Sequence, residues 1–177
     1  YTNTRHNIGF KIIDAINAHF KLSKQKPKFK GLLTTGSIEE EKIYAIKPLT
    51  FMNNSGTAIK ELIDYFKIDA KDVFVFHDDL DIDFGKIKAK FGGSSAGHNG
   101  IESIDKFIGK DYSRVRIGIG HPKQKKKVNN HVLEDFKEDE EEKINEITEN
   151  IVKQLPTLIK KKIDLFSSKV NQDLNGI

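Results

Sequence analysis

The segment 72–108, DVFVFHDDLDIDFGKIKAKFGGSSAGHNGIESIDKFI, combines two different strand patterns with a glycine-rich loop and a helix. Residues 72–77 are almost continuously apolar, which is typical of a strand that is buried on both faces. Residues 86–91 alternate lysine with apolar residues, which is typical of a strand with one exposed face. The apolar residues of that alternation are predicted to face inward: Ile87, Ala89 and Phe91. Strands followed by a helix within one segment favour an α/β fold.

Two amphipathic helices are predicted elsewhere, because apolar residues recur at steps of three and four positions. The stripe of the first helix consists of Phe10, Ile13, Ile16 and Phe20. The stripe of the second consists of Ile59, Leu62, Ile63 and Phe66. Asn54 or Ser55 is predicted to cap the second helix.

Further strands are predicted over 29–38, 41–47 and 113–120. A helical segment is predicted over 135–166, with an interruption at Pro156, and the tail after it is expected to be loose. The chain length suits one hydrophobic core, so we expect residues 1–177 to form a single α/β domain with a mostly buried sheet.

The composition predicts a soluble globular protein without a membrane-spanning segment, because no run of about 18 apolar residues exists. The lack of cysteine excludes disulfide bonds and thiolate metal sites and fits a cytoplasmic location. The net charge of the chain is +4, and five lysines lie within residues 21–30. Such clustering indicates either a polyanionic partner or, as charge alone slightly favours, a solvated lysine-rich surface.

Two kinds of ligand site are disfavoured by the motifs. Gly92 and Gly97 have the spacing of a phosphate-binding P-loop, but His98 and Asn99 stand where that motif needs lysine and a hydroxyl residue. Nucleotide-triphosphate hydrolysis is therefore excluded, whereas an ordinary loop ending in an Asn-Gly turn stays open. The six histidines include no pair at a chelating spacing and no H-E-x-x-H motif, so no metal site is predicted.

Four polar residues lie at the ends of predicted strands and helices, where the ligand crevice of an open α/β sheet is expected. They are His6, Asn53, Asp78 and Asn99. A histidine that titrates near neutrality suits a general base acting on water, and an aspartate on its other ring nitrogen would orient it. Asparagine side chains can donate to a developing oxyanion. Taken singly, each residue fits a structural role at least as well, as a packed histidine, a turn acid or a turn asparagine.

Four motifs resemble, in order and spacing, those of the bacterial-type peptidyl-tRNA hydrolases: TRHNIGF, KPLTFMNNSG, HDDLDIDFGKIKAKFGGSSAGHNGIESI and RVRIGIGHP. The resemblance covers nearly the whole chain and is strongest over 1–133. It implies a single domain with a mixed, mostly parallel twisted sheet flanked by helices. It also implies hydrolysis of the ester between a peptide and the 3′ ribose of tRNA, which recycles tRNA from stalled translation. The strand and the G-L-G-N-P-G loop with which family members open are absent before Tyr1.

The resemblance also implies roles for individual residues. It makes His6 the base that activates water and Asp78 its orienting partner. The residues that would bind the peptide and the scissile carbonyl are Tyr1, Asn53 and Asn99. The residues that would contact tRNA phosphates are Lys88, Lys90 and Arg116.

We therefore expect a monomeric cytoplasmic enzyme whose partner is peptidyl-tRNA, with no cofactor, no metal and no membrane contact. The main alternative is a non-catalytic RNA-binding relative of the same fold, which would keep the basic surface and lose the histidine–aspartate pair. A metal-dependent hydrolase is the third alternative, and a chelator would discriminate it.

Overall fold

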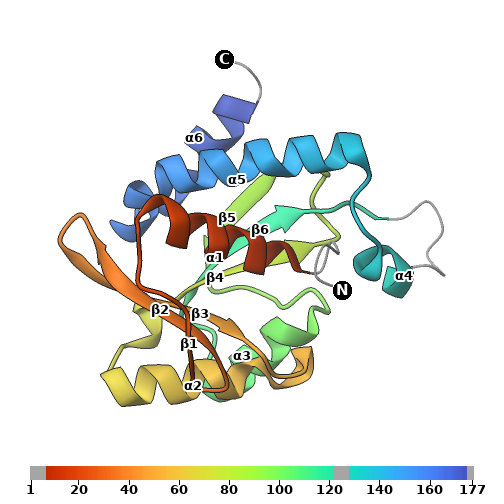
Figure 1. Ribbon diagram of the computed structural model, residues 1–177. Coiled ribbons are helices and arrows are strands. Elements are labelled where there is room, and N and C mark those ends of the chain that lie inside the picture. The colour runs from red at the N-terminus through yellow and green to blue at the C-terminus, as the bar shows by residue number, and fades with distance from the viewer. Residues whose placement is uncertain (1–6, 122–127, 175–177) are drawn as a thin grey trace. The chain divides into compact units, whose positions relative to one another are not determined.

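The computed structural model describes residues 7–121 and 128–174 (Figure 1). Helices and strands alternate along these residues, which confirms the predicted α/β class. The chain divides into two compact units that are interleaved in sequence. The first unit draws on the ranges Tyr1–Ala15, Val75–Lys90 and Arg114–Ile177, and the second on Ile16–Phe74 and Phe91–Ser113.

The sheet of the second unit is antiparallel, with the strand order β1-β2-β3. Its strands are β1 (Lys26–Lys28), β2 (Gly31–Ile38) and β3 (Glu41–Pro48). The two-residue turns Phe29 with Lys30, and Glu39 with Glu40, have φ between 48 and 69°. Positive φ at both turn residues gives the twist that joins antiparallel strands most directly. The two predicted strands are confirmed as β2 and β3. The strand β1 lies where we expected a loop. Its proline and lysines are found in edge strands as well as in loops, so the composition did not distinguish the two.

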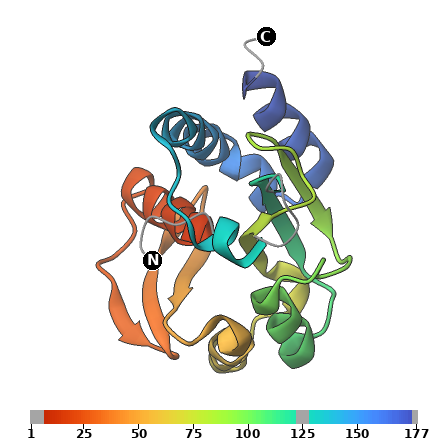
Figure 2. The same ribbon diagram turned by 90° about the vertical axis from the view of Figure 1, so that its right-hand side faces the viewer.

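Two helices of the second unit, α2 (Ser55–Phe66) and α3 (Asn99–Ile108), lie side by side (Figures 1 and 2). Their backbones come close at Gly56, where a Cβ would collide with the carbonyl oxygen of Ser103. The Gly56 amide donates to Ser103 Oγ over 2.9 Å. The buried face of α2 includes three residues of the predicted stripe: Ile59, Leu62 and Ile63.

A single turn of 3-10 helix, η2 (Met52–Asn54), leads directly into α2, and a second one, η3 (Ala70–Asp72), follows it. Asn54 occupies the N-cap position of α2, as predicted, but its side chain makes no capping hydrogen bond. Ser55 Oγ instead donates to the carbonyl of Met52 over 2.9 Å. This bond ties the start of α2 to the η2 turn that carries Asn53.

The other sheet has the strand order β4-β6-β5, and most of its residues belong to the first unit. Its strands are β4 (Phe74–Asp79), β5 (Ile87–Phe91) and β6 (Ser113–Gly118). Backbone bonds pair β4 with β6 in parallel, from Ser113 N to Val73 O and from Ile119 N to Asp79 O, and β5 with β6 antiparallel, from Gly118 N to Lys86 O and from Gly92 N to Tyr112 O. The mixed character is confirmed, whereas parallel pairing, which we expected to predominate, joins only β4 and β6 among the described strands. Two-residue turns account for the antiparallel pairs of the β1-β2-β3 sheet, whereas β5 and β6 are joined by residues 92–112, which include α3, so the length of this connection does not determine their direction.

The alternation predicted for β5 is confirmed over most of the strand. Ile87 is buried, while Lys88 and Lys90 are exposed. Phe91, which we expected to face inward, is 47% exposed, because the strand ends there and the chain turns into the glycine-rich loop at Gly92, where φ is 71°.

The helix α1 (Ile8–His19) matches its prediction in extent, but its buried face overlaps the predicted stripe only in part. Ile8, Ile12 and Ile16 are its most buried residues, and of these only Ile16 belongs to the stripe, whose other members are half-buried. The helix approaches β4 at Gly9, where a Cβ would collide with the carbonyl oxygen of Phe76. This close contact selects the face next to Gly9, which sequence periodicity alone does not determine.

The C-terminal segment forms two packed helices, α5 (Glu138–Ile159) and α6 (Ile163–Leu174), after the short α4 (Val128–Leu133). Pro156 lies inside α5, and the interruption that we expected there occurs instead at Lys161, where φ is 63°. None of the helices in the described ranges is long and apolar enough to cross a membrane.

The tail that we expected to be loose is helical as far as Leu174, because α6 packs along β5. Asn171 Oδ1 accepts from the Ile87 amide over 3.0 Å, and its Nδ2 donates to the Ile87 carbonyl over 2.9 Å. Ser167 Oγ accepts from the Ala89 amide over 2.8 Å. These side chains satisfy backbone groups that an edge strand otherwise exposes.

Candidate functional site

Two predicted site residues, Tyr1 and His6, lie outside the described residues, which begin at residue 7. Asp78, Lys88, Lys90 and Arg116 lie in the first unit, and Asn53 and Asn99 lie in the second.

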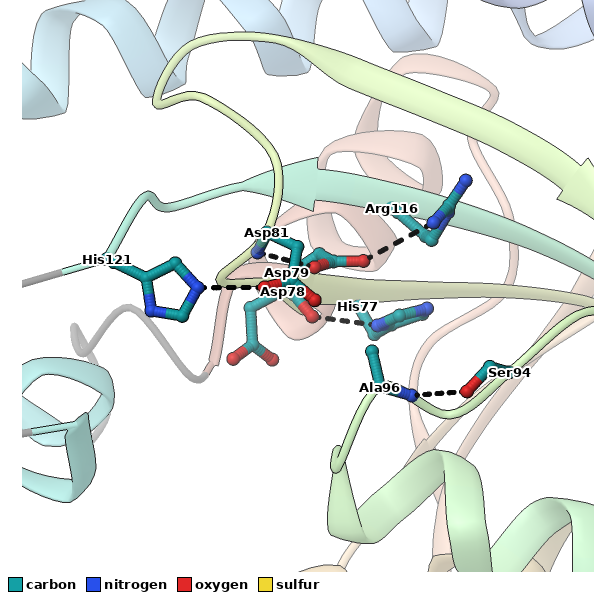
Figure 3. Close-up of polar contacts among 8 residues, drawn as sticks. All are labelled: His77, Asp78, Asp79, Asp81, Ser94, Ala96, Arg116 and His121. Carbon is teal, nitrogen blue, oxygen red and sulfur yellow. Dashed lines mark hydrogen bonds and ion pairs between the residues drawn. The ribbon is translucent and has the colours of Figure 1, made fainter. Parts of the chain in front are cut away.

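Asp78 is the fifth of the six residues of β4 and lies between His77 and Asp79. All three side chains are buried. The exposed fraction of Asp78 is 4%. His77 Nδ1 donates to the backbone carbonyl of Asp78 over 2.8 Å (Figure 3). Burying a carboxylate costs much free energy unless partner groups compensate its charge. The burial of Asp78 within a strand therefore distinguishes it from an exposed acidic residue of a turn.

The next two aspartates bind basic side chains of the first unit (Figure 3). Asp79 Oδ2 lies 3.7 Å from a terminal guanidinium nitrogen of Arg116, and Asp79 Oδ1 accepts from the Asp81 amide over 2.8 Å. Asp81 in turn accepts from His121 Nε2 over 2.8 Å. The Arg116 side chain is 26% exposed, so its charge is compensated on one side by Asp79 and partly accessible on the other.

Asn53 and Asn99 are exposed and come from neighbouring elements of the second unit. Asn53 lies in η2 and Asn99 is the first residue of α3, and these two elements are in contact. A Cβ on Gly100 would lie 2.7 Å from Met52 Sδ, so only glycine fits there without displacing that side chain. The structure thus brings the η2 turn and the start of α3 together, as a shared substrate contact would require.

His98 caps α3, a role that the sequence patterns did not predict. Its Nδ1 accepts from the amides of Gly100 and Ile101 over 3.1 and 3.2 Å, and these amides otherwise have no partner within the helix. Histidine is not among the usual N-cap residues, so residue preference gave no signal for it. Its position at the end of the glycine-rich loop, three residues before Ile101, was the signal available.

We expect His98→Ala to lower the free energy of unfolding by about 1 kcal/mol, the usual effect of losing an N-cap acceptor. His98→Asn should keep most of the stability, because the asparagine side-chain oxygen can accept the same bonds. Chemical denaturation of the three proteins measures the difference. An alanine variant as stable as the original protein would show that the two hydrogen bonds contribute nothing net.

The glycine-rich loop before His98 is a series of turns. Positive φ values occur at Gly92, Gly93, Ala96 and Gly97. The Ala96 amide donates to Ser94 Oγ over 3.1 Å, as Figure 3 shows, and the His98 amide donates to the Ser95 carbonyl over 2.9 Å. The loop therefore ends at His98, the N-cap residue of α3.

The two lysines and the arginine predicted to contact tRNA differ in their surroundings. Lys88 and Lys90 are exposed and alternate along β5. Arg116 faces Asp79, as described above, and Arg114, two positions earlier on β6, is 1% exposed. The strand pattern did not reveal that both arginines of β6 lie against the protein rather than in open solvent.

A metal site in this protein would need several histidine, aspartate or glutamate side chains close together. Across residues 7–121 and 128–174, no three of them gather closely enough to hold a metal ion.

Comparison with known proteins gives a consistent result. A family model described as peptidyl-tRNA hydrolase matches residues 1–176. The peptidyl-tRNA hydrolase of Pelagibacter ubique is 73% identical over 169 residues, which cover 96% of this chain and 91% of that protein. That of Ehrlichia ruminantium is 44% identical over 96% of this chain and 87% of that protein. The crystal structure of peptidyl-tRNA hydrolase from Acinetobacter baumannii is similar with a TM-score of 0.90 at 31% identity, covering 97% of this chain and 88% of that one.

Proposed function

The chain belongs to the peptidyl-tRNA hydrolase family and is an enzyme that hydrolyses peptidyl-tRNA, and we propose that a histidine-activated water performs the reaction. The observation that carries this proposal is the match along the whole chain, which includes the histidine and the aspartate of the family's motifs. The non-catalytic alternative would lack that pair.

In the proposed mechanism, His6 accepts a proton from a water molecule while the water oxygen bonds to the ester carbonyl carbon. The ester bond to the ribose oxygen then breaks, and the protonated histidine returns the proton to that oxygen. Asp78 orients the imidazole and stabilises its charged form. The burial of Asp78 supports this role, because a buried carboxylate keeps a fixed direction.

Asn53 and Asn99 are proposed to bind the peptide and the scissile carbonyl, with Tyr1 as a further contact. Amide side chains both donate and accept, so they suit a peptide backbone and an oxyanion alike. The contact between η2 and α3 supports a shared role for the two asparagines.

Lys88, Lys90 and Arg116 are proposed to contact tRNA phosphates. The exposure of both lysines supports this role, because they are free to approach a phosphate. For Arg116, Asp79 Oδ2 at 3.7 Å partly compensates the charge of the guanidinium, and the side chain remains 26% exposed and accessible to a phosphate. We propose further that the protein works as a single-domain monomer in the cytoplasm, where its substrate arises during translation.

The proposal that no metal takes part has a direct test. Peptide release from purified peptidyl-tRNA is measured with and without a chelator, and we expect equal turnover because the described residues provide no cluster of metal ligands. Loss of turnover that zinc or magnesium restores would establish a metal-dependent hydrolase instead. Binding of tRNA without any peptide release would establish the non-catalytic alternative.

A further inference from the structure

Four aromatic side chains of the second unit form a cluster where α2 ends on the antiparallel sheet. Phe66 stacks on Tyr44 with ring centroids 4.0 Å apart, and it contacts Phe29 at 5.7 Å and Tyr65 at 4.9 Å. Phe29 and Tyr65 lie 5.4 Å apart. Phe66 is half-buried at the centre of the cluster, whereas Tyr65 is 63% exposed.

Lysines surround this cluster on the same side. Lys28 Nζ lies 4.5 Å from the centre of the Tyr65 ring and 5.1 Å from that of Phe29. Lys42 Nζ lies 5.6 Å from the ring of Tyr44. These distances are those of cation–π contacts, so the ammonium groups lie over aromatic faces rather than against carboxylates.

The strand register places further lysine on that face. Lys26 pairs with Leu33 and Lys28 with Gly31, two residues apart on β2. Thr35 and Ser37, the next residues on that side of β2, pair with Tyr44 and Lys42. Because paired residues of an antiparallel sheet point to the same face, Lys26, Lys28, Lys42 and Tyr44 share one face of the sheet. Together with Phe29 and Tyr65 they form what we call the lysine–aromatic surface.

Protection of the sheet edge explains only part of this arrangement. Lysine and proline on β1, whose three residues are all exposed, keep an edge strand from pairing with another chain. That function does not require an exposed tyrosine beneath a lysine. Exposed aromatic rings among cations are instead the features with which proteins bind unpaired nucleotides, by stacking bases and neutralising phosphates.

We propose that the lysine–aromatic surface binds a single-stranded segment of RNA, with a base stacked on Tyr65 and phosphates against the lysines. Lys26, Lys28 and Lys42 give this surface a positive charge that complements a phosphate backbone, whereas the neighbouring Lys30 pairs with Glu61 over 3.3 Å. An acidic peptide would use these lysines but would gain little from the aromatic face. The flexible side chain of Lys28 moves from the ring to a phosphate when a base takes its place.

This surface adds an RNA contact to those of the proposed function and depends on none of the residues assigned to catalysis. Its test therefore uses RNA without an ester bond. RNA binding by this surface and peptide release are measured separately. If the surface does not bind RNA, the catalytic proposal is unaffected, and if the catalytic proposal is wrong, RNA binding by this surface is unaffected.

The first experiment measures the affinity for a fluorescent single-stranded RNA oligonucleotide and for a duplex of the same length by anisotropy. Tyr65→Ala should weaken single-strand binding by about 5- to 100-fold, the range of one lost base stack, and duplex binding much less. Tyr65→Phe should retain the affinity, because the aromatic face remains. Equal affinity of the alanine variant and the original protein for the single strand would overturn the proposal.

The second experiment measures the salt dependence of single-strand binding. Lys28→Ala should reduce the slope of log affinity against log salt by about 0.7, the value for one phosphate contact of a single strand. Lys60→Ala is the matched control, since Lys60 is an exposed lysine of α2 that pairs with Asp64 at 3.1 Å, and it should leave the slope unchanged. An unchanged slope for Lys28→Ala would contradict the phosphate contact. Binding of polyglutamate with the same dependence on Tyr65 would assign the surface to acidic proteins instead.

Discussion

Replacing His6 with alanine should lower the turnover of peptidyl-tRNA by about 10²–10⁴-fold, the effect typical of losing a general base. Water is a weak nucleophile at neutral pH, so the proposed reaction depends on a group that takes its proton as the carbon–oxygen bond forms. The affinity for tRNA should change little, because the residues proposed to contact phosphates are elsewhere in the chain. Single-turnover peptide release, together with tRNA binding, measures the two effects separately.

His19→Ala provides the matched control, since His19 is an exposed histidine in the last turn of α1. It should retain full turnover. Asp78→Asn should lower turnover less than His6→Ala does, because the base is still present and only its orientation suffers. If His6→Ala hydrolyses its substrate at the original rate, His6 has a structural role and the attacking water is activated by another group.

Local patterns in the sequence predicted the elements whose burial is determined by their own residues. The alternation around Ile87 and the apolar stripe of α2 both identified the inward-facing side chains, since strand and helix periodicity are geometric properties of the backbone. The face of α1 and the extent of α6 were not predictable in this way. Asn171 stabilises α6 through bonds to Ile87, which is 84 residues away in sequence, and no local pattern contains that information.

In the candidate site, too, sequence motifs indicated some residues, whereas contacts between distant parts of the chain could not be predicted. Asp78, Asn53 and Asn99 could be proposed as site residues because their motifs resemble those of a known family. The partner of Arg116 could not, since its contact with Asp79 joins two strands that are far apart in the chain. The exposed tyrosine and its lysines were also missed as a surface, although the lysine-rich segment was noted, because three chain segments contribute to it.

Replacing Gly56 with alanine should lower the free energy of unfolding by about 2 kcal/mol, although alanine favours helix formation by about 1 kcal/mol over glycine. The added methyl would collide with the backbone carbonyl of Ser103, which can move only if α2 and α3 separate. Their separation would also break the bond from the Gly56 amide to Ser103 Oγ. Because η2 continues into α2 and α3 begins at Asn99, the same shift should displace Asn53 from Asn99 and lower turnover. Chemical denaturation and peptide release measure both effects.

The double variant Gly56→Ala with Phe107→Ala determines which atom is responsible. The added methyl would also lie 2.7 Å from Phe107 Cδ2, but this side chain is 37% exposed and can turn away. Removing it should therefore restore neither stability nor turnover, since the backbone contact remains. If the double variant regains the original stability, the side chain rather than the carbonyl limits the approach of α2 to α3. An unchanged stability of Gly56→Ala alone would show that the helix pair adjusts freely, and that the spacing between Asn53 and Asn99 is not determined at this contact.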